Sequence, residues 1–190
     1  MIAGLLLAAG GARRFGSQKL LATIEGSPIV RLAAERLAAE TDALWVVVGW
    51  EAEAIRRALG PIASSLVENE PWERGLSSSL AAGIAALPTD VEAIVIGLGD
   101  QPFLDRDVIR RVIAAWRDTG RPIVSARYRG VRGHPVLLDR RVLDEASNVS
   151  GDVGARGLIA RDPERVGFVD VNADPPRDVD TVDDLSALER

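Results

Sequence analysis

An apolar run leads straight into a glycine- and arginine-rich segment near the start of the chain, Leu5-Leu6-Leu7-Ala8-Ala9-Gly10-Gly11-Ala12-Arg13-Arg14-Phe15-Gly16-Ser17-Gln18-Lys19. The uninterrupted apolar character of residues 2–9 predicts a buried strand. Lys19 is the only lysine among the 23 lysine and arginine residues. Glycines let backbone N–H groups approach a phosphate, and a compact ammonium suits a phosphate oxygen better than a planar guanidinium does. We therefore interpret the segment as a phosphate-binding loop rather than a plain surface turn.

The loop belongs to neither of the two commonest phosphate-binding patterns. Gly11 and Gly16 have the glycine spacing of a P-loop, but Ser17 stands where its lysine should be and no Ser or Thr follows Lys19. Counted from Gly10 or Gly11, no glycine occupies the third position of the dinucleotide pattern G-x-G-x-x-G. The sequence thus predicts a phosphate loop of another kind.

Strand-like and helix-like segments alternate through the rest of the chain. We expect strands at residues 43–49, 66–68, 93–98, 122–126 and 166–171. Helices are expected at residues 29–39, 51–59, 77–87 (capped by its opening serines), 105–118, 140–146, in a segment that ends at residue 160, and from residue 181. Residues 128–138 contain a glycine turn and predict an added hairpin or arm. The alternation predicts one α/β domain over residues 1–190, with a Rossmann-like, mostly parallel sheet and helices on both faces.

Composition excludes several classes of protein. The 190 residues are 47% hydrophobic and 27% charged, which is ordinary for a globular domain. A net charge of -5 argues against a general nucleic-acid binder. The absence of cysteine excludes disulfides and thiolate metal sites and fits a cytoplasmic protein. The run 2–9 is too short to span a membrane, so no membrane partner is expected.

Two acidic segments are candidate metal sites. Asp100 follows the predicted strand 93–98 directly, and ligands of open parallel sheets collect at such carboxyl ends. A carboxylate there can hold Mg²⁺ against substrate phosphates, and Asp105 is available to cap the next helix. Asp180 lies in an acidic stretch in which Thr181 and Asp184 form a capping-box pattern. Its carboxylate is therefore either a second metal ligand or part of a helix cap.

Together these segments resemble the molybdenum cofactor nucleotidyltransferases (MobA-like and MocA-like), which are NTP transferases with a glycosyltransferase-A-like, Rossmann-type fold. The opening matches the family pattern except that Ala12 replaces a serine. The later matches are Asn69-Glu70-Pro71-Trp72 with Gly75 and Ser78-Ser79-Leu80, Gly99-Asp100-Gln101-Pro102, Gly133-His134-Pro135, Gly151-Asp152-Val153-Gly154-Ala155-Arg156, and Asp178-Val179-Asp180-Thr181.

The resemblance implies Mg²⁺-dependent transfer of CMP from CTP to the terminal phosphate of molybdopterin, with release of pyrophosphate. Ala9 gives the Leu-Ala-Ala-Gly form that resembles the cytidylyl branch, whereas the guanylyl branch has a second glycine there. The alternatives are a guanylyltransferase for the same cofactor, a nucleotidyltransferase for a sugar or polyol phosphate, and a non-catalytic chaperone of the cofactor. A transient contact with a molybdoenzyme is also implied.

The resemblance assigns roles to individual residues as well. Lys19 would meet the α-phosphate and Arg14 the β/γ end, and Asp100 and Asp180 would hold Mg²⁺. The expected nucleotide contacts are Leu7, Ala8, Ala9, Gly10, Gly11, Arg14, Lys19, Asn69, Ser78 and Ser79, the last three at the base or ribose. The catalytic set is Lys19, Arg14 and Asp100.

The acceptor side is expected within residues 127–160, together with Gln101. Gln101, His134, Asp152 and Arg156 are the candidate contacts. His134, the only histidine, is equally consistent with a structural turn residue before Pro135, and Asp152 with an N-cap. Trp72 is interpreted as a packing residue.

Overall fold

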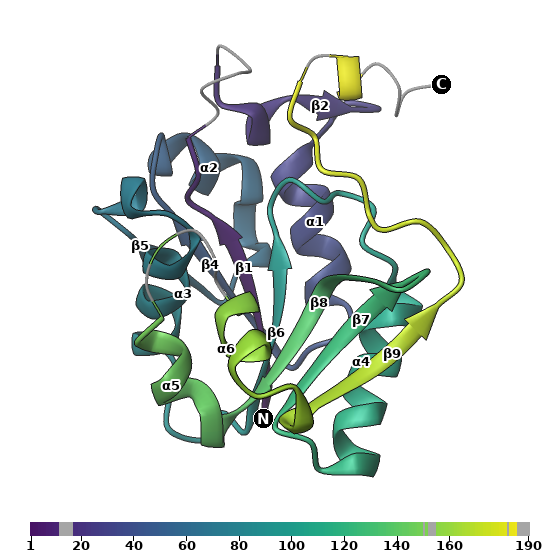
Figure 1. The fold of residues 1–190 in the computed structure, drawn as a ribbon. Helices are drawn as coiled ribbons and strands as arrows, with labels where there is room; N and C mark the ends of the chain where they lie inside the picture. Colours follow the sequence, from purple (N-terminus) through teal and green to yellow (C-terminus); the bar gives the residue numbers. More distant parts are fainter. Residues whose placement is uncertain (12–16, 150, 152–154, 182, 186–190) are drawn as a thin grey trace.

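The computed structural model describes residues 1–11, 17–149, 151, 155–181 and 183–185. A seven-stranded sheet runs through it in the order β5-β4-β1-β6-β8-β7-β9 (Figure 1). Its strands are β1 (Ile2–Ala8), β4 (Ala43–Val48), β5 (Ser65–Glu68), β6 (Ala93–Leu98), β7 (Ile123–Tyr128), β8 (Val131–Asp139) and β9 (Val166–Val171). Only β8 runs antiparallel to its neighbours in this sheet, so the prediction of a mostly parallel sheet is confirmed.

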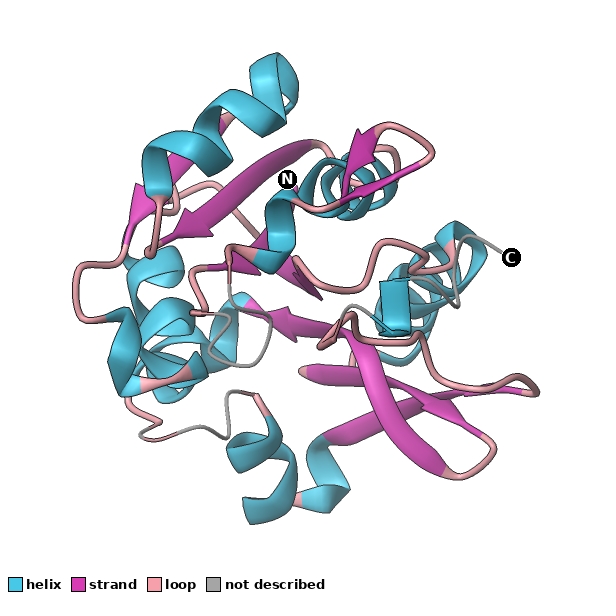
Figure 2. Cartoon of the chain, turned by 90° about the horizontal axis from the view of Figure 1, so that it is seen from above, coloured by secondary structure: helices cyan, strands magenta, loops and turns pink. Residues whose placement is uncertain are grey.

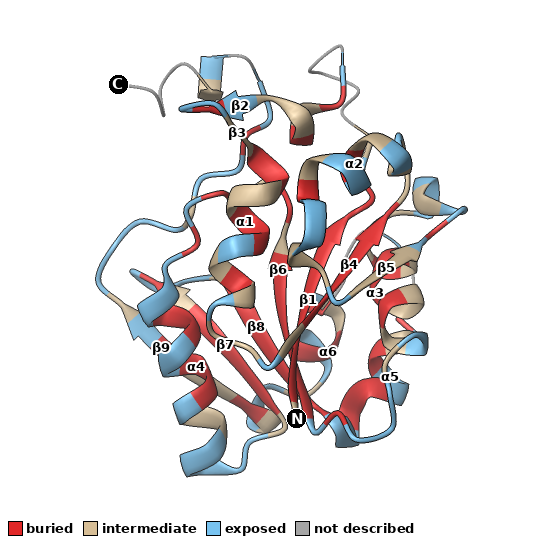
Figure 3. Ribbon diagram, turned by 180° about the vertical axis from the view of Figure 1, so that it is seen from behind, coloured by how far each residue is buried: buried red, intermediate tan, exposed pale blue. Residues whose placement is uncertain are grey.

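Helices cover both faces of the sheet, as predicted. One face carries α1 (Ile29–Ala38), α2 (Ala52–Leu59) and α4 (Arg106–Thr119), and the other carries α3 (Leu76–Ala85), α5 (Leu143–Ser147) and α6 (Arg156–Arg161). Figure 2 shows the sheet between these two layers from above. Strand β1 feeds both cores because successive side chains of a strand point to opposite faces: Leu6 joins one cluster, and Leu5 and Leu7 the other. The strands around β1 are accordingly buried on both faces (Figure 3).

The prediction of an added hairpin or arm at residues 128–138 is wrong about where the second strand lies. Strand β8 does not project from the domain but lies inside the sheet, between β6 and β7. Leu138 pairs with Ile94, and Val136 pairs with Ile96, so the apolar half of β8 is buried in the core. Burial of this apolar half draws β8 into the sheet and leaves only the turn end of the hairpin exposed.

The start of α3 also differs from the prediction. The helix begins at Leu76, and its N-cap is Gly75, which makes no side-chain cap hydrogen bond. Ser78 lies inside the first turn and donates back to the Gly75 carbonyl at 2.8 Å. The predicted cap of α4 is confirmed, because the Asp105 carboxylate accepts a hydrogen bond from the Asp107 amide at 2.8 Å.

Short elements that the pattern did not predict follow the phosphate loop. A 3-10 turn, η1 (Lys19–Leu21), leads into the hairpin of β2 (Thr23–Ile24) and β3 (Ser27–Pro28). Glu25 and Gly26 both have positive φ, as a two-residue turn of this kind requires. Buried Leu20 and Ile24 anchor this segment in the core beside α1, so the backbone that carries Lys19 is held in place. Among the described residues, no helix is both long enough and apolar enough to cross a membrane.

Candidate active site

A cavity of about 470 Å³ opens at the carboxyl ends of β1 and β6, the place where open parallel sheets bind ligands. Eight residues predicted to contact nucleotide or metal line it: Leu7, Ala8, Ala9, Gly10, Gly11, Lys19, Ser79 and Asp100. Leu20, Trp72, Glu73, Arg74, Gly75, Leu76 and Leu98 complete the lining. The first turn of the chain and the end of β6 therefore face one shared cavity.

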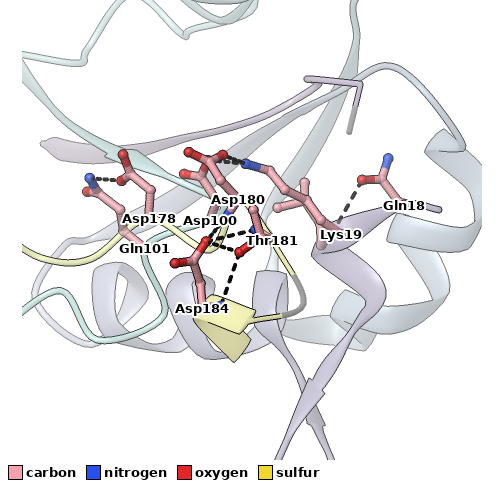
Figure 4. A network of polar contacts seen from close by, with 9 residues as sticks. Gln18, Lys19, Asp100, Gln101, Asp178, Asp180, Thr181 and Asp184 are labelled. Carbon is pink, nitrogen blue, oxygen red and sulfur yellow. Dashed lines mark hydrogen bonds and ion pairs between the residues drawn. The ribbon is translucent and has the colours of Figure 1, made fainter. Parts of the chain in front are cut away.

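Lys19 bridges two carboxylates at the edge of this cavity (Figure 4). Its Nζ donates to Oδ2 of Asp100 and to Oδ1 of Asp180, at 2.7 Å each. Burial alone would lower the pKa of Lys19, but the attraction of Asp100 and the hydrogen bonds to both carboxylates outweigh it and raise the pKa above its usual value. The ammonium is therefore charged at neutral pH and holds together two segments that are 80 residues apart in the sequence.

Gln18 fixes the backbone from which Lys19 projects. Its side-chain oxygen accepts from the Leu20 amide at 3.4 Å, and its Nε2 donates to the Trp50 carbonyl at 2.8 Å. The Gln18 side chain is buried. Sequence analysis gave Gln18 no role, although a glutamine directly before the single lysine was the available signal.

The segment that carries Asp180 is docked by its neighbours. The Val179 amide donates to the Asp100 carbonyl at 3.0 Å, and the Val179 side chain is fully buried. Asp184, rather than Asp180, supplies the capping carboxylate, which accepts from the Asp180 and Thr181 amides. The predicted pairing of Thr181 with Asp184 is therefore present, and the Asp180 carboxylate is left to face Lys19.

Gln101 lies beneath the site rather than at the surface expected for acceptor contact. It is buried and lines neither the main cavity nor the smaller cavity beside His134 that is described below. Its Nε2 donates to Oδ1 of Asp178 at 2.7 Å. Burial, followed by repulsion from Asp100 and Asp180, raises the pKa of Asp178, although the Gln101 hydrogen bond opposes the shift. This placement favours a positioning role for Gln101, which ties the acidic carboxyl-terminal segment to the loop after β6.

The predicted base contacts divide between two hollows. Asn69 is buried and donates from Nδ2 to the hydroxyls of Ser78 and Ser79, at 3.0 Å each. Ser79 lines the main cavity, whereas Asn69 and Ser78 line a neighbouring hollow beside α3. Asn69 thus orients Ser79, and of these three residues Ser79 alone reaches the main cavity.

Trp72 packs against the phosphate loop and also forms part of the cavity wall. A Cβ added to Gly11 would lie 2.6 Å from the Trp72 ring, and one added to Gly49 would lie 2.7 Å from Trp72 Cβ. Both distances are too short for any side chain, so the glycines allow the indole to lie directly on the backbone. The packing role is consistent with this geometry, but the sequence gave no indication that the ring faces the ligand cavity.

A second cavity, of about 330 Å³, lies between β8 and α6 and brings together His134 and Arg156. Leu76 lines both this cavity and the first, so the two adjoin. Ser125, Val131, Arg132, Gly133, Val136, Ala155 and Ile159 complete the lining. Two of the four predicted acceptor contacts therefore meet beside the main cavity. Asp152, like Arg14 in the loop, lies outside the described residues.

The imidazole of His134 is expected to make stability depend on pH. Burial, followed by the Arg156 charge, lowers the pKa of His134 to about 4 from an ordinary 6.5. Between these values the unfolded chain binds more protons than the folded one, so stability falls as the pH drops from 6.5 towards 4. At 1.36 kcal/mol per pH unit, the loss approaches about 3 kcal/mol. Urea unfolding of wild type and His134→Gln across this range measures it.

The substitution leaves every other ionisable side chain in place, so the difference between the two curves isolates the histidine. The wild type should lose more stability than the variant on acidification. Parallel curves would contradict a buried, neutral imidazole.

The acidic pair fits a divalent cation that is shared with substrate phosphates. Asp100 Oδ2 and Asp180 Oδ1 both lie 2.7 Å from one nitrogen, so they are close enough to approach the same ion. Within the described ranges, no group of three or more His, Cys, Asp or Glu side chains is arranged to hold a metal. Mg²⁺ commonly uses one or two carboxylates together with phosphate oxygens and water. Two carboxylates beside this cavity are therefore an adequate protein contribution.

Comparison with known proteins agrees with this geometry. Residues 4–166 match the family described as the MobA-like NTP transferase domain. Over 98% of this chain and 96% of the relative, the sequence is 36% identical to a nicotine blue oxidoreductase of Paenarthrobacter nicotinovorans. A molybdenum cofactor guanylyltransferase of Mesorhizobium japonicum is 31% identical over 72% of this chain and 65% of its own.

Among solved structures, Rv0371c of Mycobacterium tuberculosis H37Rv superposes with a TM-score of 0.86 at 31% identity, covering 98% of this chain and 96% of that one. A structure of Rv0371c in complex with manganese matches with a TM-score of 0.82 at 29% identity, with the same coverage. The manganese complex supports a divalent metal in this group of proteins. These matches show that the chain belongs to the MobA-like NTP transferase family, and the glycine segment and the acidic pair lie at the cavity where such a fold binds its ligand.

Proposed function

We propose that the protein transfers CMP from CTP to the terminal phosphate of molybdopterin and releases pyrophosphate, with Mg²⁺ as the cofactor. The observation that carries this proposal is that Lys19 and Asp100 line one cavity together with Gly10 and Gly11, while Lys19 also contacts Asp180. The adjoining cavity with His134 and Arg156 is the proposed acceptor side. A triphosphate and a phosphorylated acceptor would then meet near Leu76, which lines both.

The proposed chemistry is an in-line displacement. An oxygen of the acceptor phosphate attacks the α-phosphorus, a new P–O bond forms, and the bond to the pyrophosphate oxygen breaks. The acceptor is already a nucleophile, so the protein is asked mainly to align two anions and stabilise charge. Lys19 would hold the α-phosphate, and amides of Gly10 and Gly11 would line the chain of phosphates. Mg²⁺ on Asp100 and Asp180 would neutralise phosphate charge when bound.

The choice of CTP rests on the end of β1. Ala9 is buried, yet it lines the cavity, and we propose that its methyl group narrows the space that a glycine would leave open. A narrower pocket favours a pyrimidine base over a purine, although a single methyl group supports only modest discrimination between nucleotides. Relatives named as guanylyltransferases make GTP the leading alternative.

A panel of four nucleoside triphosphates tests the proposal, with molybdopterin as acceptor, pyrophosphate release as the readout, and mass spectrometry of the product. We expect CTP to give the fastest release and a cytidylylated product. Preference for GTP would identify a guanylyltransferase, and turnover only with a sugar or polyol phosphate would identify another acceptor. Tight nucleotide binding without pyrophosphate release would favour a cofactor chaperone.

The similarity to a nicotine blue oxidoreductase makes redox chemistry a second candidate. Its name specifies oxidation or reduction of nicotine blue, and the match covers 98% of this chain. The phosphate loop lacks the dinucleotide glycine pattern, which argues against it. Decolourisation of nicotine blue by the protein with a reduced nicotinamide dinucleotide, and no pyrophosphate release with any triphosphate, would favour this candidate.

A further inference from the structure

The ammonium of Lys19 stands where a cation shared by Asp100 and Asp180 would have to bind. It contacts one oxygen of each carboxylate at 2.7 Å, and these contacts use two of its three donors. Mg²⁺ binds oxygen ligands at about 2.0–2.1 Å, so an ion held by the same two oxygens would approach the ammonium closely. Two like charges at such a separation repel strongly, and the site cannot hold both in these positions.

We propose that Lys19 is a built-in counter-cation of the acidic pair: it competes with divalent metal for Asp100 and Asp180, and it leaves them only when a nucleotide phosphate can take the ammonium. The proposal rests on the proposed function to the extent that the cavity accepts a nucleoside triphosphate. Lys19 then has two successive anionic partners, the carboxylates before binding and the phosphate afterwards.

The environment of Lys19 makes the exchange conditional. The side chain is only 14% exposed, so an ammonium displaced without a new partner would be poorly hydrated. Asp180, at 53% exposure, is open to solvent on its outer side, where an incoming ion can reach it. A metal ion alone therefore displaces the ammonium at a cost, whereas a metal–nucleotide complex supplies the replacement partner. Metal and nucleotide should consequently raise each other's affinity, and the coupling is reciprocal.

Binding of Mn²⁺ without nucleotide tests the competition directly, by electron paramagnetic resonance of the free ion or by calorimetry. We expect Lys19→Met to bind Mn²⁺ at least about tenfold more tightly than wild type, since the ion no longer has to break charge-assisted hydrogen bonds. Asp180→Asn should weaken binding, which assigns the ion to this pair. Equal or weaker binding to Lys19→Met, or no measurable binding to either protein, overturns the proposal.

Arg177→Gln is the matched control, because any loss of positive charge favours a cation in general. Arg177 is exposed and adjoins Asp178, but it makes none of the ion pairs recorded among the described residues. Its removal should change Mn²⁺ affinity by less than about threefold, as expected for a solvent-screened charge. If Arg177→Gln gained as much Mn²⁺ affinity as Lys19→Met, the effect would come from overall charge alone, and the proposal would be overturned.

A second titration, with CTP present, measures the coupling. In wild type CTP should tighten Mn²⁺ binding by a larger factor than in Lys19→Met, and equal factors would contradict the exchange. If wild type binds no nucleotide at all, the proposed function fails while the comparison without nucleotide still decides the competition. Circular dichroism checks each fold, and Lys19→Gln replaces Lys19→Met if the latter does not fold.

Discussion

Turnover should fall at least about a hundredfold when Lys19 is replaced by alanine, because one preorganised charge contact is typically worth about 2.7–4 kcal/mol at a transition state. The ammonium is a charged donor at the cavity edge, positioned by Gln18 and the two carboxylates. Pyrophosphate release at saturating CTP measures the loss. Circular dichroism and thermal unfolding should show an intact fold, since Lys19 lies outside the two hydrophobic clusters.

Two further variants test whether the loss of turnover is specific to the Lys19 ammonium. Arg31→Ala removes a partly exposed cation from α1 that pairs with Glu35 and lines neither the main cavity nor the cavity beside His134, so turnover should stay near wild type. Lys19→Arg keeps the charge but should restore little activity, because a planar guanidinium binds two oxygens side by side and does not replace a compact point charge at one phosphate oxygen. Near-wild-type turnover of Lys19→Ala at saturating CTP would refute the assigned role.

The framework of the fold was predictable because its strands are strongly apolar. Residues 2–8, 43–48 and 93–98 are buried on both faces, and such strands show uninterrupted apolar runs in the sequence. Their carboxyl ends then locate the glycine loop and Asp100 at one edge of the sheet. The main cavity was therefore within reach of sequence analysis, even before any family was considered.

What the sequence could not supply was long-range placement. Strand β8 has an apolar end and a polar end, so its pattern suits a hairpin arm as well as a sheet strand; its pairing with β6 decides between them. Asp180 approaches Lys19 only because Val179 is buried against the loop after β6, a contact that local pattern does not reveal. Gln101 likewise meets Asp178, which is 77 residues away. Tertiary contacts of this kind override local propensity.

The second large effect is expected for Asp100→Asn, which should raise the Mg²⁺ concentration required for half-maximal turnover by about a hundredfold or more. Loss of a ligand orientation alone typically costs 10–100-fold in metal affinity, and removal of a charged ligand should cost at least as much. The substitution keeps the shape of the side chain, and the Val179 bond to the Asp100 carbonyl uses only backbone atoms. Titration of turnover with Mg²⁺ at fixed CTP provides the measurement.

Asp105→Asn is the matched control for that experiment. It removes one negative charge from the same loop, five residues further on, while asparagine preserves the N-cap that Asp105 forms at the start of α4. Its Mg²⁺ requirement should stay close to that of wild type. If Asp100→Asn also shows an unchanged requirement, Asp100 does not hold the metal, and its observed contact with Lys19 would instead serve only to position the ammonium. If both variants shift equally, the effect reflects loss of negative charge in general, because the two substitutions differ in whether the carboxylate reaches the cavity.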